Sequence, residues 1–304
     1  MGGKKVSAHK MNGDKVFDVV NYALLTLVVL IVLYPLIFVV SASISDPILV
    51  NSGEVWLLPK GITLEGYKSV LEYEMIWVGY ANTIFYTIVG TAINLSLTLL
   101  TAYALSRKDL IGRNVFTMFF AFTMYFSGGL IPTYITVKNL GLLDTRAVML
   151  VLGAISMYNV IITRTYFSNN IPFELQEAGF LDGCSDAGLF IRVILPLSLP
   201  IIAVMALYYA VGHWNSYFNA MIYLTDRNKM TLQIFLREVL LLNQLADMMG
   251  SADTDEMLRI AERQKMAMIM KYCLIVVSTA PILCVYPFLQ RYFVKGIMVG
   301  AVKG

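Results

Sequence analysis

Small and polar residues interrupt an apolar chain at Glu177-Ala178-Gly179-Phe180-Leu181-Asp182-Gly183, followed thirteen residues later by Pro196. Ala178 and Gly179 carry almost no side chain, so another surface can approach them closely. Glu177 and Asp182 offer negative charge to such a surface. We interpret this stretch as a docking element.

The composition around this stretch is that of a membrane protein. Of the 304 residues, 58% are hydrophobic and 14% are charged, and the mean hydropathy is +0.69. A soluble domain of this length would need far more charge to cover its surface, so the apolar excess is expected to face lipid. The net charge is only +3 and forms no basic stripe, which argues against a nucleic-acid partner.

Six apolar runs are long enough to form membrane helices, since crossing roughly 30 Å of hydrocarbon takes about 20 helical residues. The first run is longer than the core of a signal peptide and lacks a cleavage site, so we expect it to remain in the membrane. The sequence therefore predicts an all-α integral membrane protein with six transmembrane helices. The runs cover residues 16–43, 77–105, 115–137, 147–167, 201–224 and 266–290.

Basic residues gather on one side of these predicted spans. They precede the first span in residues 1–15, fill the turn after the second, and follow the sixth in the tail 291–304. Basic residues near membrane ends mark the cytoplasmic side, so both termini are predicted to be cytoplasmic. Because successive spans cross the membrane in opposite directions, residues 169–200 are predicted to lie in the cytoplasm and the segment 225–265 outside.

The segment 169–200 has the pattern of two helices joined by a turn. Asn170 is expected to cap the first helix, and Pro172 suits its opening turn. Gly183 is expected to end that helix in the left-handed conformation, and Ser185 to cap the next one. The second helix is expected to break at Pro196, after an apolar stripe that can anchor it. The stripe consists of Leu189, Phe190, Val193 and Ile194.

This segment resembles the EAA loop of ABC importer permeases, in which Glu-Ala-Ala, three residues, Gly and nine residues precede Ile, any residue and Leu-Pro. Two positions differ: Gly179 replaces the second alanine and Val193 replaces isoleucine. The resemblance implies a type I permease fold in which this coupling loop sits in a groove of an ATPase subunit. It assigns ATPase coupling to Glu177, Ala178, Gly179, Asp182, Gly183, Leu195 and Pro196.

The rest of the chain resembles the carbohydrate permeases that include the second membrane subunit of maltose-like importers. The stretches that carry this resemblance are Tyr34-Pro35-Leu36, residues 214–219, residues 286–296 and the ending 300–304. The resemblance implies inward movement of a sugar or oligosaccharide by alternating access in a bacterial plasma membrane. It also implies a second, different permease chain, two ATPase subunits and an extracellular or periplasmic substrate-binding protein.

The chain lacks the GxxxxGK[ST] pattern that cradles phosphates. We therefore expect ATP and Mg²⁺ to be bound by the partner ATPase subunits, with no cofactor, metal or catalytic residue in this chain. The rival classes are an ion-driven secondary transporter acting alone and a membrane-embedded enzyme. Intramembrane acidic relays would favour the first, and a buried nucleophile or metal cluster the second, but neither is visible.

Polar and aromatic residues within the spans are candidates for a substrate pathway, because amides can bond sugar hydroxyls and rings can stack on sugars. Helix packing and an interfacial aromatic belt explain most of them equally well. His213 lacks a ligand set and is expected to pack or form hydrogen bonds inside the bundle. The pathway candidates are Asn94, Tyr125, Asn159, Trp214, Asn215, Tyr217 and Asn219.

The external segment 225–265 is long for a turn, and its apolar residues recur at helical spacing, so we expect it to contain helices. It is either a solvated cap or, with residues 50–73, a receiver for the binding protein. The tail 291–304 either folds along the cytoplasmic face or reaches an ATPase subunit. Cys184, Cys273 and Cys284 are too scattered for a disulfide framework and are expected to be free thiols.

Overall fold

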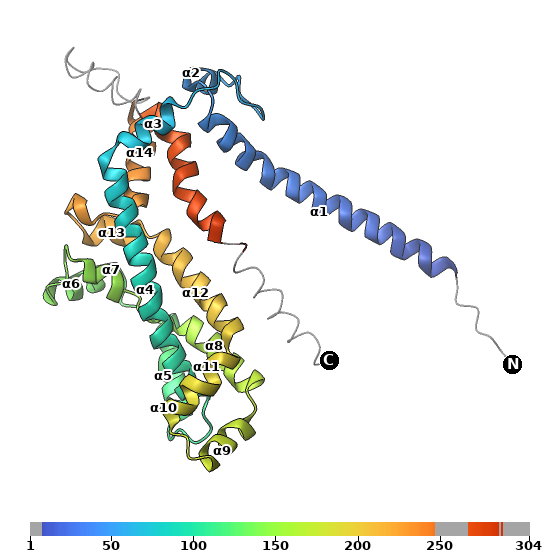
Figure 1. The fold of residues 1–304 in the computed structure, drawn as a ribbon, viewed down its shortest axis with the longest axis vertical. Coiled ribbons are helices and arrows are strands. Elements are labelled where there is room, and N and C mark those ends of the chain that lie inside the picture. Colours follow the sequence, from blue (N-terminus) through green and yellow to red (C-terminus); the bar gives the residue numbers. More distant parts are fainter. Residues whose placement is uncertain (1–7, 247–266, 286, 288–304) are drawn as a thin grey trace. The chain divides into compact units, whose positions relative to one another are not determined.

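The computed structural model of the chain describes residues 8–246, 267–285 and 287, and all regular structure in these ranges is helical (Figure 1). The expected all-helical class is confirmed. The chain divides into two compact units, one formed by residues 1–72 and 239–277 and the other by residues 73–238 and 278–304. The whole predicted tail 291–304, and residues 247–265 of the predicted external segment, lie outside the described residues.

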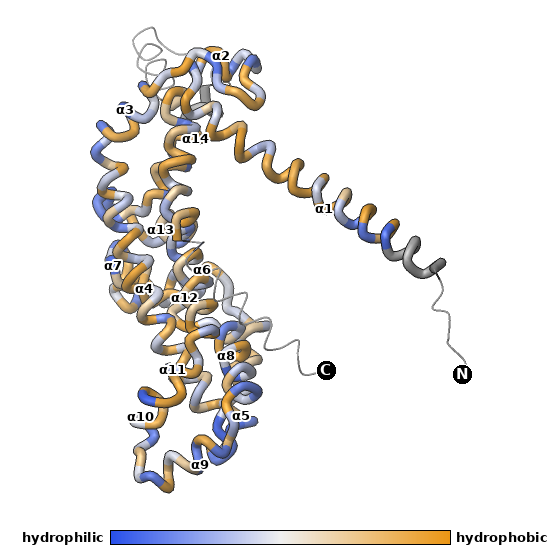
Figure 2. Tube along the Cα trace, turned by 45° about the vertical axis from the view of Figure 1, so that its right-hand side comes forward, coloured by the Kyte–Doolittle hydropathy of each residue, from blue (hydrophilic) through white to orange (hydrophobic). Residues whose placement is uncertain are grey.

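α1 (Ala8–Ser43) is a continuous helix that contains the first predicted span. From Lys15 onward it offers 29 residues with a mean hydropathy of 3.0, enough to cross a membrane. Every residue from 15 to 37 is exposed, and most of these residues are hydrophobic (Figure 2). A helix that buries so little against its own chain must meet lipid or another membrane protein.

The remainder of the first unit packs around the end of α1. It includes α2 (Pro47–Asn51), α3 (Glu65–Glu72) and the first part of the helix Ala267–Val285. The Cys273 thiol donates a hydrogen bond to the Ser43 carbonyl at 3.0 Å. All three cysteines are free thiols, as expected.

The second unit is organised around α4 (Glu74–Ser106), on which two further helices pack (Figure 1). With 33 residues, α4 is about 50 Å long at 1.5 Å per residue. The other elements are α5 (Arg113–Tyr125), α6 (Leu130–Asn139), α7 (Arg146–Val151), α8 (Met157–Asn170), α9 (Phe173–Leu181), α10 (Asp186–Leu189), the π-helical turn η1 (Phe190–Ile194), α11 (Leu195–Leu197), α12 (Leu199–Trp214), α13 (Phe218–Tyr223) and the 3-10 turn η2 (Arg227–Lys229). The long helix α14 (Leu232–Ala246) begins in this unit.

Polar groups join α4 to α12 along their shared face. His213 Nε2 lies 2.9 Å from Asn94 Oδ1, and one turn further along the hydroxyls of Thr98 and Tyr209 lie 2.6 Å apart. Gly90 allows this approach, since a Cβ there would lie 2.4 Å from the His213 ring. Interhelical hydrogen bonds between close-packed helices stabilise membrane bundles. The expected packing role of His213 is confirmed.

Three of the predicted spans are interrupted, which corrects the expectation of continuous helices. Residues 115–137 form α5 and α6, which meet at an angle of 111°. Gly129 lies at this break with a φ of 83° and a ψ of −178°, a conformation almost restricted to glycine. Residues 147–167 are divided between α7 and α8, and residues 201–224 between α12 and α13.

These breaks change how many helices can span a membrane without interruption. In the described ranges three helices are long and apolar enough, or up to five if each sharply bent pair counts as one span. Six runs were predicted because hydropathy averages over a window and does not register a bend. Broken helices with irregular backbone occur at membrane depth where protein or a cavity surrounds them.

Candidate functional site

The first helix of the coupling loop, α9, begins after Pro172 and ends at the predicted glycine turn. Gly183 has a φ of 75°, and its N–H donates to the Phe180 carbonyl at 3.0 Å. This left-handed residue ends the helix as expected. The expected cap by Asn170 is wrong, because Asn170 belongs to the end of α8 and its amide donates to the Tyr166 carbonyl.

One face of α9 and its turn is open to the surroundings. Glu177 and Ala178 are exposed, as are Asp182 and Gly183 in the turn. Leu181 is 89% exposed, which is unusual for a leucine beside polar residues. Two carboxylates, two small residues and an apolar side chain therefore form a surface on which a partner can lie closely.

The other face of α9 packs against α10. A Cβ at Gly179 would lie 2.7 Å from Leu189 Cδ1, and Leu189 is fully buried. The glycine that departs from the family pattern therefore makes room for this leucine. Gln176 is the buried residue of α9, and its Oε1 accepts no hydrogen bond from the described residues.

The second half of the coupling loop is one helical stretch with a π-helical turn in its middle. Ser185 caps it as expected, accepting a hydrogen bond from the Gly188 N–H at 3.2 Å. Three residues of the predicted apolar stripe are buried, namely Leu189, Phe190 and Ile194. They pack with α4, α8 and α12 in one hydrophobic cluster.

The predicted break at Pro196 is wrong by two residues. The helical stretch Asp186–Leu197 continues through Leu195 and the exposed Pro196, and it meets α12 at an angle of 83° after Ser198. Pro196 lies in the last turn of this stretch, close behind the π-helical turn η1, and the stretch ends at the next residue, Leu197. The bend therefore separates the coupling loop from the membrane helix that follows it.

Arg107, directly after α4, contacts two elements of the coupling loop. Its Nη1 donates to Asp186 Oδ1 at 2.7 Å and to the Tyr103 hydroxyl at 3.2 Å. Its Nε donates to Asp109 Oδ1 at 2.8 Å, and Nη2 pairs with the other oxygen of the same carboxylate. The Phe180 ring of α9 lies 5.1 Å from the guanidinium carbon. These hydrogen bonds from Arg107 lower the pKa of the Asp109 carboxyl.

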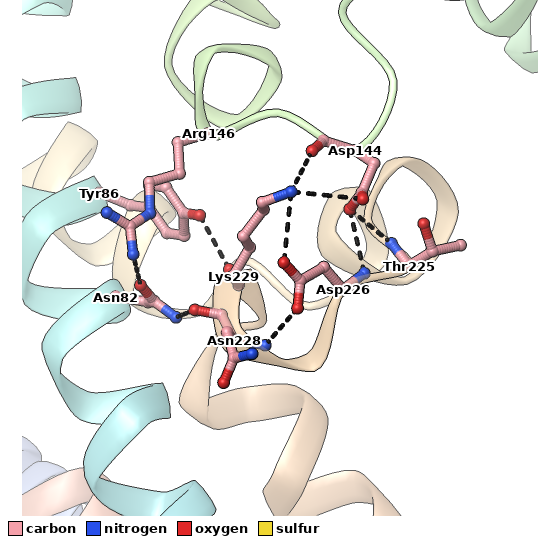
Figure 3. Close-up of polar contacts among 8 residues, drawn as sticks. All are labelled: Asn82, Tyr86, Asp144, Arg146, Thr225, Asp226, Asn228 and Lys229. Carbon is pink, nitrogen blue, oxygen red and sulfur yellow. Dashed lines mark hydrogen bonds and ion pairs between the residues drawn. The ribbon is translucent and has the colours of Figure 1, made fainter.

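A second polar cluster joins two loops near the start of α4 (Figure 3), and we call it the external cluster after the side of the membrane predicted for these loops. Asp144 accepts hydrogen bonds from the backbone N–H groups of Thr225 and Asp226, both at 3.0 Å. Lys229 Nζ lies 3.3 Å from carboxylate oxygens of both Asp144 and Asp226. The backbone N–H groups of Asp226 and Thr225, helped by Lys229, lower the pKa of Asp144 to about 2.

α4 supplies the other side of the external cluster (Figure 3). The Asn82 amide donates to the carbonyls of Asn228 at 2.8 Å and Met230 at 3.1 Å. Its Oδ1 accepts from Arg146 Nη2 at 3.1 Å. The Tyr86 hydroxyl donates to the Lys229 carbonyl at 2.8 Å. Sequence reasoning missed this cluster, although Asn82 is an amide within a predicted span.

Two of the three buried pathway candidates already use their polar side chains inside the chain. Asn94, Asn159 and Trp214 are buried. The Asn94 amide donates to the Gly153 carbonyl at 3.0 Å in addition to its contact with His213. Trp214 Nε1 donates to the Ser278 carbonyl at 3.0 Å. These bonds favour a packing role for Asn94 and Trp214.

The remaining pathway candidates are more accessible and come from two places. Asn215 and Tyr217 lie between α12 and α13, where the predicted fifth span is broken, and Asn219 is the second residue of α13. Asn215 and Tyr217 are exposed, and the Arg237 guanidinium lies 5.2 Å from the Tyr217 ring. Tyr125, at the end of α5, is 82% exposed. Contact of these residues with cargo stays a prediction.

A pocket of about 390 Å³ lies between α6 and α7. Its walls are mostly apolar and are made by residues of both helices together with Gly128 and Gly153. The seven pathway candidates lie elsewhere, although Asn94 bonds the carbonyl of the wall residue Gly153.

Known proteins resemble the chain over nearly its whole length. Residues 95–299 match the family described as "Binding-protein-dependent transport system inner membrane component". The polygalacturonan/rhamnogalacturonan transport system permease protein YtcP of Bacillus subtilis is 40% identical over 291 residues, which cover 96% of this chain and 99% of that protein. Protein LplC of the same organism is 40% identical over 296 residues, covering 97% and 98%.

A solved structure shows the same likeness in three dimensions. It is a crystal structure of a bacterial ABC transporter involved in the import of the acidic polysaccharide alginate. One of its chains is 36% identical to this chain, with a TM-score of 0.81 over 92% of this chain and 98% of the other. The resemblance inferred from the coupling-loop motif is thereby confirmed, and the rival classes find no support in these comparisons.

Proposed function

Because the chain belongs to the family of inner membrane components of binding-protein-dependent transport systems, we propose that it moves an oligosaccharide inward across a bacterial plasma membrane. The chain is a permease subunit of an ABC importer, a multi-pass membrane protein, and not an enzyme. Hydrolysis of ATP belongs to a separate ATPase partner.

The proposed cargo class is an acidic oligosaccharide. The observation that carries this proposal is the end-to-end likeness to a permease named for polygalacturonan and rhamnogalacturonan. Galacturonan is a polymer of a uronic acid, and the solved relative belongs to an importer of another acidic polysaccharide. Neutral oligosaccharides form the competing class, since more distant relatives are named for arabinooligosaccharides and galactooligosaccharides.

The proposed assembly contains this chain, a second and different permease chain, two ATPase subunits that bind ATP and Mg²⁺, and a substrate-binding protein outside. The coupling residues are Glu177, Ala178, Gly179, Asp182, Gly183, Leu195 and Pro196. The open face of α9 supports this assignment, because its small residues and carboxylates fit a groove on another protein. Both termini are placed in the cytoplasm, and the loops around residues 50–73 and 225–265 face the binding protein.

In this proposal the ATPase subunits move the coupling loop when they close around ATP. The loop is attached to α12 through the bend after Ser198 and packs on α4 and α8. Movement of the loop would therefore reorient several membrane helices together and alternate access to a central path.

Uptake by the reconstituted importer tests this function. The chain is co-expressed with the permease, ATPase and binding-protein genes of its importer and placed in liposomes that contain ATP. We expect ATP-dependent accumulation of oligogalacturonides, weaker accumulation of neutral arabino-oligosaccharides, and an ATPase that copurifies with the chain. Preference for the neutral sugar would overturn the acidic cargo, and transport by the chain alone would overturn the importer assignment.

A further inference from the structure

The turn after α4 is the place where the coupling loop meets the end of the longest helix of its unit. From the geometry of this turn we propose that Arg107 is a positioning residue that fastens the coupling loop to α4 and transmits its movement. This inference rests on the proposed function, because it concerns the step between the ATPase subunits and the membrane helices. Arg107 contacts no cargo in this proposal.

The guanidinium of Arg107 is mostly buried and uses all three of its nitrogens. The side chain is 12% exposed, so its charge is only weakly screened by solvent. Nε and Nη2 form a bidentate pair with Asp109, while Nη1 reaches Asp186 and Tyr103. A planar fork satisfies this arrangement, whereas the single ammonium of lysine does not.

The contacts of Arg107 join the two halves of the coupling loop. The guanidinium lies beside the Phe180 ring of α9 at 5.1 Å and bonds Asp186, the first residue of α10. It also lies 5.9 Å from the Tyr103 ring. That ring is packed 4.8 Å from Phe190 of η1. One residue therefore connects α9, α10 and η1 to the last turn of α4.

Besides its contact with Arg107, α9 is attached through Gly179, which packs against Leu189, and through the Phe173 ring, which lies 5.1 Å from Lys108 Nζ. Gln176 is its buried residue, and the faces of Glu177 and Ala178 point to the surroundings. Force applied to α9 by a docked ATPase would reach the end of α4 through Phe180 and Arg107, with a weaker contribution from the Lys108 contact, and would reach α12 through the chain itself. Without Arg107, we expect the loop to move while α4 follows incompletely.

Uptake and ATP hydrolysis measured on the same liposomes test this role. Arg107→Gln should lower the sugar taken up per ATP hydrolysed by about tenfold, the effect of losing one charge-assisted interaction. Arg107→Lys should recover part of the loss. Arg113→Gln is the matched control, because it removes one positive charge near the same turn without touching the partners of Arg107.

Asp186→Asn provides a variant that folding defects do not confound, since this side chain is 70% exposed. It should lower the same ratio by about threefold, as expected for the exposed partner of a charged pair. If the two residues act as one unit, Arg107→Gln with Asp186→Asn should be no worse than Arg107→Gln alone. Losses that multiply instead would contradict a shared role.

The wild-type importer separates failure of this inference from failure of the proposed function. If wild-type liposomes show no ATP-driven uptake, the function is wrong. If they do, and the ratio of uptake to hydrolysis is unchanged in Arg107→Gln and Asp186→Asn, the role of Arg107 is wrong. Equal losses of both activities also leave the ratio unchanged and count against it.

Discussion

Both ends of α4 hold ion pairs within the chain, but only the coupling-loop end also presents a docking face with exposed carboxylates. At the external cluster, Asp144 and Lys229 are satisfied by groups of their own chain, including backbone N–H and carbonyl groups. At the coupling loop, Glu177 and Asp182 remain exposed on a helix that buries little. Between Asn82 and Ser106 the helix rises about 36 Å. The difference indicates that the external cluster is closed by contacts within the chain, whereas the coupling loop leaves a surface free for a partner.

This contrast predicts different consequences of mutation. Changes at the coupling loop should alter the relation between uptake and ATP hydrolysis beyond any loss of stability that they cause. Changes at the external cluster should alter stability and leave that relation intact.

The largest effect is expected from Gly183→Glu. The residue has a φ of 75°, where a side chain costs about 1–3 kcal/mol, and it lies on the docking face. We expect uptake to fall more than tenfold, a loss of about 1.4 kcal/mol in coupling free energy or more, while the complex still inserts and hydrolyses ATP.

The matched control for that variant is Gly141→Glu. Gly141 also has a positive φ, 67°, and is exposed in a different loop. It should bear the same backbone strain while uptake per ATP stays normal. Equal loss of coupling in both variants would show that strain, and not the docking face, is responsible.

At the opposite end, Asn82→Leu should have the next largest effect. It leaves the carbonyls of Asn228 and Met230, and the Arg146 guanidinium, without this partner. Loss of buried hydrogen bonds of this kind costs about 2 kcal/mol, which lowers the melting temperature by about 5 °C. Thermal unfolding of the purified complex measures it, with the exposed Asn139→Leu as control. A changed ratio of uptake to hydrolysis would break the contrast between the ends.

Acid should weaken the contacts of Asp144 in the external cluster over a defined range of pH. The pKa of Asp144 is about 2 in the folded chain, below the ordinary value of about 3.9. A lowered carboxyl pKa stabilises the fold above about pH 4, and this stabilisation is lost as pH falls toward 2. Melting curves should therefore show the wild type above Asp144→Asn at pH 6, with the gap narrowing as the pH falls below about 4 and closing only below about pH 2. A constant gap would exclude this cause.

The smallest effect is expected from Gly179→Ala, which restores the residue that the family pattern prefers. The new Cβ would press against Leu189 Cδ1, while alanine favours the helix by about 1 kcal/mol. The contact with Leu189 and the helix preference of alanine act in opposite directions, so we expect uptake to change by less than about threefold. Adding Leu189→Val should relieve the contact, so a double variant worse than both singles would contradict this packing.

The coupling loop was predictable because its determinants are local in the chain. Ser185 and Gly183 act on their own helix ends, and the spacing to Pro196 lies within one segment. The contacts of Arg107 with Asp186 and of Asn82 with Asn228 join distant residues, and backbone carbonyls carry no sequence signal. The bend near Gly129 was missed because apolar residues continue through it. Buried polar residues such as Asn94 were correctly found, but sequence alone does not separate packing from contact with cargo.

The π-helical turn η1 affects the direction in which the docking face of the coupling loop points. A π turn holds one more residue than an α turn would, and each residue of an α-helix turns the chain by about 100°. If the residues 190–194 were wound as a regular α-helix without losing a residue, α10, with α9 attached to it, would swing by most of that angle around the helix axis. The π turn and the number of residues between Gly183 and Pro196 thus set the direction of the docking face together, and a substitution that converts the π turn to α geometry would misalign that face even with every motif residue present.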